Sequence, residues 1–208
     1  MKKGIIIAVI ALVCVICVVC FMNKGGEEPE NVVTPDVPES ITMNTLSATS
    51  AADLTDLVNR IYEGNQELYS SLATQEIDVT DKDMVNSFTG LETGDALEYL
   101  VVSEPMMSSQ AYSMVLVKAK DGADVDEMAK SMNEDIDERK WICVTAEKIY
   151  TATSGNVICL VMSNPDTAKT VYESFKTIAG GIGEEYERTA ETPEMPEDML
   201  PGQDGLAY

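Results

Sequence analysis

The chain has 208 residues, with 14 Lys plus Arg against 36 Asp plus Glu, so its formal net charge at pH 7 is -22. This charge would repel nucleic acid and anionic lipid headgroups, so we expect no nucleic-acid partner. The sequence contains no histidine, which excludes Ser-His-Asp and Cys-His nucleophile activation and removes the commonest zinc ligand.

An unbroken apolar run, Gly4 to Met22, comes directly after Met1, Lys2 and Lys3. As a helix that rises about 1.5 Å per residue, this run reaches roughly the 30 Å of a bilayer's hydrocarbon core. No signal-peptidase pattern of small residues follows the run, and each cysteine within it follows Val or Ile, unlike a lipoprotein cysteine. The run predicts an uncleaved transmembrane signal anchor over residues 4–22.

The distribution of lysines predicts the orientation of this anchor. Lys2, Lys3 and the terminal amine precede the run, whereas Lys24 alone follows it and is soon joined by acidic residues. Since the more basic flank stays inside, residues 1–3 should form a cytoplasmic end. The expected localisation is the cell membrane, single-pass, with the N-terminus cytoplasmic and the C-terminal domain extracytoplasmic.

Composition divides the remainder into three parts. Residues 23–50 mix Gly, Pro, Glu, Ser and Thr without periodicity, which predicts a flexible stalk. Residues 51–183 suit one domain of ordinary size. Residues 184–208 include eight acids and three prolines and predict a disordered acidic tail.

The first expected element of the domain is a helix that begins near Ser50 or Asp53. Its apolar stripe recurs at a spacing of three to four residues and consists of Leu54, Leu57, Val58, Ile61 and Leu68. A polar stretch, Thr74 to Asp83, follows. A short helical turn around Val85 and Phe88 should then end at Gly90.

Two strands and a second helix are expected next. Residues 96–103 are rich in Leu, Val and Tyr, and residues 112–120 have a continuous apolar middle, as in a strand buried on both faces. The helix should begin with Asp124 as its cap and Glu127 three residues later.

A hairpin and a third helix complete the domain. Residues 148–153 and 156–163 flank Ser154 and Gly155, which predicts two strands joined by a tight turn. Asn164 and Pro165 should start the helix and Gly180 should end it. The order α-β-β-α-β-β-α predicts the α+β class, as a small two-layer α/β sandwich behind the transmembrane helix.

Four motifs together resemble a known family: DLVNRIYE, EYLVVSEPMMS, VLVKAK and GNVICLVMS, within residues 52–180. The chain is similar to the uncharacterised extracytoplasmic family of Gram-positive bacteria called domain of unknown function 4358. Members often have a lipoprotein cysteine, which this chain lacks, and the difference concerns tethering rather than fold. The resemblance implies an envelope-tethered domain and supplies no activity, substrate or site residue.

Candidate nucleophiles are few. Cys143 and Cys159 are the cysteines outside the apolar run, and a disulfide and two free thiols are both compatible with their spacing. A sortase-like reaction would need a histidine beside the thiol. Ser103 or Ser108 with Lys118 or Lys120 could form a Ser-Lys pair, although the Ser-Met-x-Pro pattern of leader peptidases is missing.

Two further features have competing interpretations. Asp121, Asp124 and Asp126 alternate as in a calcium loop, but the loop glycine and distal glutamate are misplaced, which favours capping by Asp124. Met106 and Met107 could form an exposed apolar lip for a partner or fill gaps in the core. We therefore assign no catalytic, cofactor-binding or metal-binding residue and no cofactor.

The expected function is a membrane-anchored, non-catalytic binding or interaction module of the cell envelope. Its expected partners are the membrane, through the N-terminal helix, and an envelope protein or ligand. The alternative is a carboxylate-dependent cell-wall hydrolase, since 36 acids always offer pairs of carboxylates.

Overall fold

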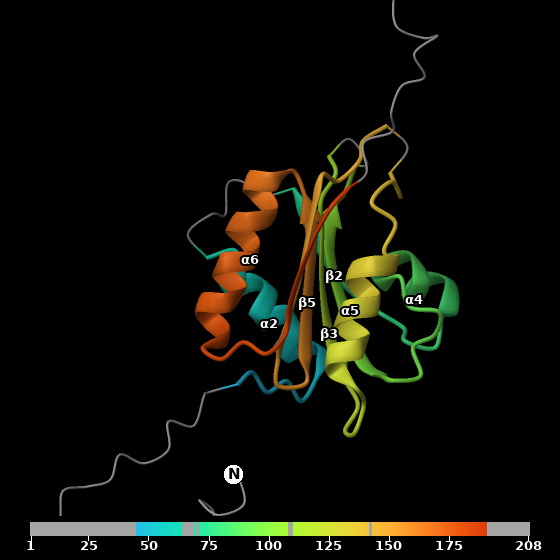
Figure 1. Cartoon of the computed structure of the whole chain (residues 1–208), viewed down its shortest axis with the longest axis vertical. Coiled ribbons are helices and arrows are strands. Elements are labelled where there is room, and N and C mark those ends of the chain that lie inside the picture. The colour runs from blue at the N-terminus through green and yellow to red at the C-terminus, as the bar shows by residue number, and fades with distance from the viewer. Residues whose placement is uncertain (1–44, 64–68, 70, 108–109, 142, 191–208) are drawn as a thin grey trace, which may run out of the picture. The chain divides into compact units, whose positions relative to one another are not determined.

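The structure is a computed structural model that describes residues 45–63, 69, 71–107, 110–141 and 143–190 (Figure 1). These residues form an α+β fold, in which one antiparallel sheet of six strands packs against four helices. In this described part of the chain, no helix combines the length and apolar character needed to cross a membrane. The predicted anchor, residues 4–22, and the predicted cytoplasmic end, residues 1–3, lie outside the described residues.

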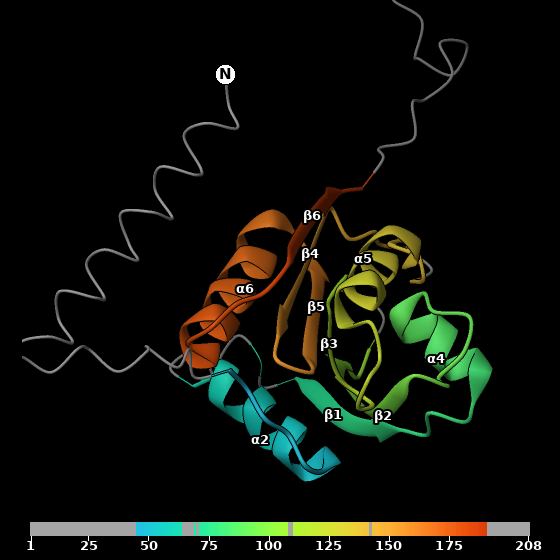
Figure 2. The same cartoon turned by 60° about the horizontal axis from the view of Figure 1, so that its bottom comes forward.

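Each helix is followed by one strand or by two consecutive strands along the chain, and the labels follow Figure 1. In chain order they are α2 (Ala51–Ile61), β1 (Leu72–Ile77), α4 (Lys82–Thr89), β2 (Leu97–Pro105), β3 (Ser113–Ala119), α5 (Val125–Asp135), β4 (Lys148–Ser154), β5 (Val157–Ser163), α6 (Pro165–Ala179) and β6 (Glu185–Thr189). The strand order is β1-β2-β3-β5-β4-β6, and every neighbouring pair is antiparallel. Figure 2 shows β1 and β6 at opposite edges of the sheet.

Side-chain caps start the helices where the sequence predicts. The side chains of Ser50, Asp124 and Asn164 each accept a hydrogen bond from a backbone N–H in the first turn of α2, α5 and α6. Gly180 ends α6 with φ +69°, a backbone conformation that glycine adopts without strain. α2 ends at Ile61, and residues 64–68 of the predicted first helix, Leu68 among them, lie outside the described residues.

The predicted two-layer sandwich is wrong in its number of layers. All seven residues of β3 and all seven of β5 are buried, so the centre of the sheet needs cover on both faces. Leu116 and Cys159 pack with α2 and α6 on one face, whereas Val117 and Ile158 pack with α4 and α5 on the other. The fold therefore has three layers, with the sheet in the middle (Figure 1).

Both edge strands lie in segments where the sequence predicts no strand. β1 overlaps the start of the predicted polar stretch. Its residues 73–76 are all exposed, so the sequence shows no apolar alternation that would predict a strand. β6 lies within the predicted disordered tail, 184–208. Three of its five residues are charged, and such composition predicts disorder rather than a strand. Backbone pairing with β2 and β4 holds these strands in place, and the sequence pattern does not reveal such pairing.

The domain also begins earlier than predicted. In the predicted stalk, 23–50, the backbone N–H of Leu46 donates to Ser154 Oγ at 3.1 Å, and Ala48 is 5% exposed. Gly155, with φ +60°, forms the predicted hairpin turn, and a Cβ there would lie 2.7 Å from the Leu46 carbonyl oxygen. Residues 46–48 and β6 therefore pack with the domain predicted for 51–183.

Candidate functional site

The two cysteines outside the apolar run are free thiols rather than a disulfide. Cys143 is exposed, and Cys159 is buried in β5. Burial raises the pKa of Cys159 well above its usual value, so this thiol stays protonated and inert. Cys159 is therefore a core residue, and Cys143 is the accessible thiol of the pair.

The structure does not bring Ser103 and Lys118 together. Ser103 is buried in β2, accepts a hydrogen bond from Thr74 Oγ1 at 3.2 Å and lies opposite Met114. Lys118 lies four residues further along β3, which corresponds to about 13 Å. Lys118 instead forms an ion pair with Glu98. Of the other predicted pair members, Lys120 binds a backbone carbonyl, that of Asp95, at 2.8 Å, and Ser108 lies outside the described residues.

A different lysine and serine do meet, on the face covered by α4. Lys140 Nζ donates to Ser113 Oγ at 3.3 Å and forms an ion pair with Glu104. Its ammonium also lies 4.7 Å from the ring centroid of Phe88, and burial lowers its pKa although Glu104 opposes this shift. Ser113 is fully buried, so no substrate could reach its hydroxyl. The two residues are 27 positions apart in the sequence, and no sequence motif predicts their contact.

The three alternating aspartates have different contacts. Asp124 caps α5 by accepting from the Glu127 N–H at 3.1 Å, and Asp126 accepts from Thr153 Oγ1 at 3.3 Å. Asp121 is exposed. Within the described ranges, no three His, Cys, Asp or Glu side chains converge closely enough to hold a metal ion. The predicted capping by Asp124 is confirmed.

Four described carboxyls have a clearly shifted pKa, and each shift is downward. They are Asp53, Asp78, Glu138 and Glu185. Hydrogen bonds from Thr49 lower the pKa of Asp53, and a hydrogen bond from Lys176 lowers that of Glu185. These four groups are therefore ionised near neutral pH, whereas a glycosidase general acid needs a raised pKa.

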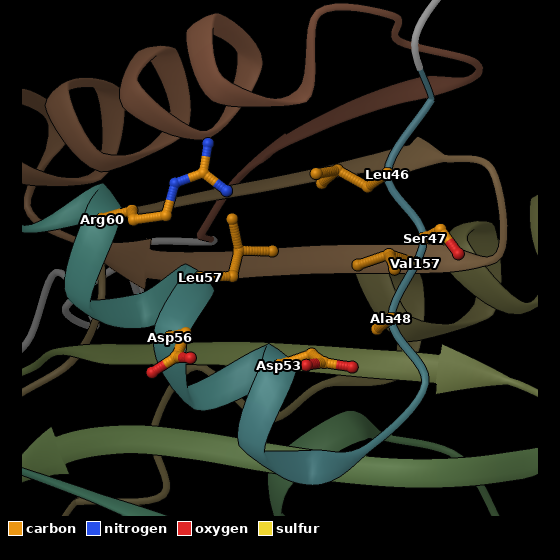
Figure 3. Close-up of a pocket in the computed structure, with 8 residues that line it drawn as sticks. All are labelled: Leu46, Ser47, Ala48, Asp53, Asp56, Leu57, Arg60 and Val157. Atoms are coloured by element: carbon orange, nitrogen blue, oxygen red, sulfur yellow. The ribbon is translucent and has the colours of Figure 1, made fainter.

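One hollow of about 330 Å³ lies between α2, residues 46–48 and the start of β5 (Figure 3). Leu57 and Val157 face each other across it, and Arg60 reaches over it from α2. Asp53, on its rim, already accepts from the backbone N–H and hydroxyl of Thr49 at 2.7 and 2.8 Å. This aspartate is fixed as part of the helix start, which leaves Arg60, Asp56 and the apolar side chains of the hollow to a ligand.

A second hollow, of about 410 Å³, lies between α6, β4 and β6. Tyr150 and Tyr172 stack there with ring centroids 4.7 Å apart. The Glu185 carboxylate accepts hydrogen bonds from the Tyr172 hydroxyl and, at 2.7 Å, from Lys176. These groups hydrogen-bond to one another. The cluster therefore links β6 to α6 and is not a ligand site.

The third hollow is apolar and lies at the end of β2. It measures about 320 Å³, and its lining includes Ser71, Pro105 and the methionine lip, formed by Met106 and Met107. The two methionines are 79% and 74% exposed, so of the two interpretations left open by the sequence they form the exposed lip and do not fill the core. The hollow adjoins the start of β1, because the Met106 N–H donates to the Ser71 carbonyl at 3.2 Å.

The methionine lip is continuous with the outer edge of the sheet. β1 has β2 as its neighbour on one side and no strand of the described residues on the other. Figure 2 shows this strand running along the sheet margin between α2 and α4. Its residues 73–76 are exposed, so no described helix covers the margin. We call the outward side of Leu72–Ile77 the β1 edge.

The fold thus defines a three-layer α+β domain whose clearest uncovered feature is an apolar lip beside an open strand. No family model, curated protein or solved structure matches the chain. The resemblance to the domain of unknown function 4358 family therefore stays a prediction that rests on the four quoted motifs.

Proposed function

We propose that this chain is a non-catalytic binding module of the cell envelope, held at the cell membrane by residues 4–22 with its N-terminus in the cytoplasm. The α+β domain then lies outside the membrane and binds an envelope protein through the methionine lip and the β1 edge. The membrane and this envelope protein are its partners, and nucleic acid is not.

The exposure of Met106 and Met107 is the observation that supports this proposal. Both side chains are more than 70% exposed beside an apolar hollow, so a partner that covers them would remove apolar surface from water. Methionine is unbranched and adapts its shape to a facing surface, which suits a recognition site. The candidate catalytic groups offer less, because Ser103 and Lys118 are engaged elsewhere in the sheet.

Site-specific photo-crosslinking in intact cells tests the proposal. A photoreactive residue in place of Met107 should give a discrete adduct of higher mass in the membrane fraction. The matched control is Thr177, which is also exposed but lies on α6. The absence of an adduct at position 107, or the same adduct from both positions, would overturn the proposal.

The alternative, a carboxylate-dependent cell-wall hydrolase, has less support. Such an enzyme pairs a carboxyl of raised pKa with an ionised one, whereas the clearly shifted carboxyls of the described residues are all lowered. Release of reducing sugar from purified wall polysaccharide by the full chain would favour the hydrolase and count against the binding module.

A further inference from the structure

We propose that the β1 edge binds an extended, basic segment of a different protein by strand addition, so that the partner becomes a seventh strand of the sheet. This inference rests on the proposed function and specifies the mode of binding and the chemistry of the partner.

The register shows which backbone groups of β1 point away from β2. Since the Met106 N–H donates to the Ser71 carbonyl, these two residues form a hydrogen-bonded pair of the antiparallel ladder. Such pairs alternate along the strands, so Leu72, Thr74 and Glu76 direct their N–H and C=O groups away from β2. Pro105 agrees with this assignment, because it lies opposite Leu72 and has no N–H to donate.

The opposite edge of the sheet is protected and β1 is not. Three of the five residues of β6 are charged, and natural proteins use such charges to keep edge strands from pairing. The six residues of β1 include one charge, Glu76, and no lysine, proline or bulge. Main-chain groups that are exposed, unprotected and without a partner among the described residues are the features that strand addition uses.

The negative charge around the β1 edge indicates what kind of segment binds there. Residues 71–83 contain four acids, Glu76, Asp78, Asp81 and Asp83, against Lys82 alone. A second copy of the chain has a formal charge of -22, residues 191–208 have five acids and no base, and residues 23–44 have five acids and one base. Each of these candidates from the chain itself would be repelled, whereas a basic strand of another protein would be attracted.

The methionine lip supplies side-chain recognition at one end of the added strand. The hollow adjoins Ser71, the residue before β1, so an apolar side chain near that end of the partner could enter it. Side chains of a strand alternate between faces, so the partner should carry apolar residues at every second position with basic residues between them.

Hydrogen exchange of the full chain in detergent micelles tests this mode directly. The probe is a ten-residue synthetic peptide in which lysine alternates with valine or isoleucine, and the control peptide has glutamate in place of lysine. The lysine peptide should slow amide exchange at Leu72, Thr74 and Glu76 by about tenfold or more, since each amide gains a hydrogen bond. The amides of Glu185 and Glu187, on the outward side of β6, should not change.

Two substitutions at position 76 distinguish the contribution of the backbone N–H to binding from that of the side-chain charge. Glu76→Pro removes an outward N–H and no ladder bond, so the domain should stay folded and its affinity for the lysine peptide should fall about tenfold. Glu76→Thr removes the same charge but keeps the N–H, and should lose less than about threefold.

The results that would overturn the inference are specific. They are no binding of the lysine peptide, protection outside β1, equal affinity of the two Glu76 variants, or slow exchange at Leu72, Thr74 and Glu76 in the chain without peptide. The last would mean that a second copy or another part of the chain occupies the edge. If the Met107 crosslink survives in Glu76→Pro, strand addition fails while the binding function stands. If that crosslink is absent from the unaltered chain, the proposed function itself fails.

Discussion

Arg188 fixes the last strand to the end of α5. Its Nε and Nη2 donate to the carbonyls of Asn133 and Ile136 at 2.7 Å each, and its Nη1 donates to Glu138 at 2.9 Å. The carbonyls near a helix C-terminus lack partners within the helix, and a cationic planar side chain satisfies them well. The sequence alone placed this arginine in a disordered tail.

Replacing Arg188 should therefore destabilise the domain. We expect Arg188→Ala to lower the free energy of unfolding by about 2 kcal/mol, since it removes three charge-assisted hydrogen bonds at a half-buried site. Urea unfolding of the full chain in micelles measures this change. The control is Arg60→Ala on the surface of α2, which should stay within about 0.5 kcal/mol. Equal effects of the two substitutions would contradict the assignment.

The Glu138 carboxylate makes this contribution depend on pH. Burial raises its pKa, but a backbone hydrogen bond and the Arg188 guanidinium lower it, and the net value lies below the ordinary 4.5. A group whose pKa is lower in the folded than in the unfolded state stabilises the fold at pH values above its unfolded-state pKa. This stabilisation is lost as the pH falls through its folded-state pKa. The stability difference between unaltered chain and Arg188→Ala should thus be constant from about pH 7 to 5 and shrink below about 4.5. A difference that grows on acidification would refute this assignment.

Among the secondary-structure elements, the end of α4 shows how closely the second helical layer packs. Gly90 ends α4 with φ +77°, and a Cβ there would lie 2.6 Å from the backbone nitrogen of Ile136 and 2.7 Å from the carbonyl carbon of Asp135. The backbone of α4 therefore meets the end of α5 with no room for a side chain.

A matched pair of glycines tests that contact. Gly122 has a similar φ, +83°, but a Cβ there would meet no atom within 4 Å. Gly122→Ala should cost about 1 kcal/mol from backbone strain alone, and Gly90→Ala should cost about 3 kcal/mol because two backbones must also separate. Thermal unfolding of both variants measures the difference. Similar losses would mean that the two helices do not approach so closely.

Truncation tests whether β6 belongs to the folded domain. A chain that ends after Ala190 keeps β6 and should unfold at the same denaturant concentration as the full chain. A chain that ends after Glu184 loses the five residue pairs of β6 with β4 and the Arg188 contacts, so its midpoint should fall clearly. If both chains were as stable as the original, β6 would not belong to the folded domain.

The contrast between predicted and missed elements follows from where their stabilising contacts lie. Helix starts at Ser50, Asp124 and Asn164 depend on residues three positions apart, so local sequence predicts them. β3 and β5 are apolar at nearly every position and reveal their burial directly. β1 and β6 pair through backbone groups, which any sequence possesses, and their polar side chains give no signal.

At the scale of the whole molecule, the sequence indicates one part of the candidate site, the methionine lip, and not the other, the β1 edge. Two methionines after a proline are compatible in the sequence with an apolar lip or with core filling, and the structure shows that both are exposed. The open strand beside them could not be predicted, because it depends on which strand lies at the sheet margin. The buried contact of Lys140 with Ser113 was hidden for a similar reason, since it joins segments 27 residues apart.

The central claim is that an uncleaved anchor holds this domain outside the membrane, and labelling of Cys143 tests it most directly. Cys143 is exposed and Cys159 is buried, so a membrane-impermeant maleimide added to intact cells should react at Cys143. We predict a labelled full-length chain in the membrane fraction and no label in Cys143→Ser. Labelling that appears only after the cells are permeabilised, or a labelled chain that is free in the medium and begins downstream of residue 21, would contradict the account.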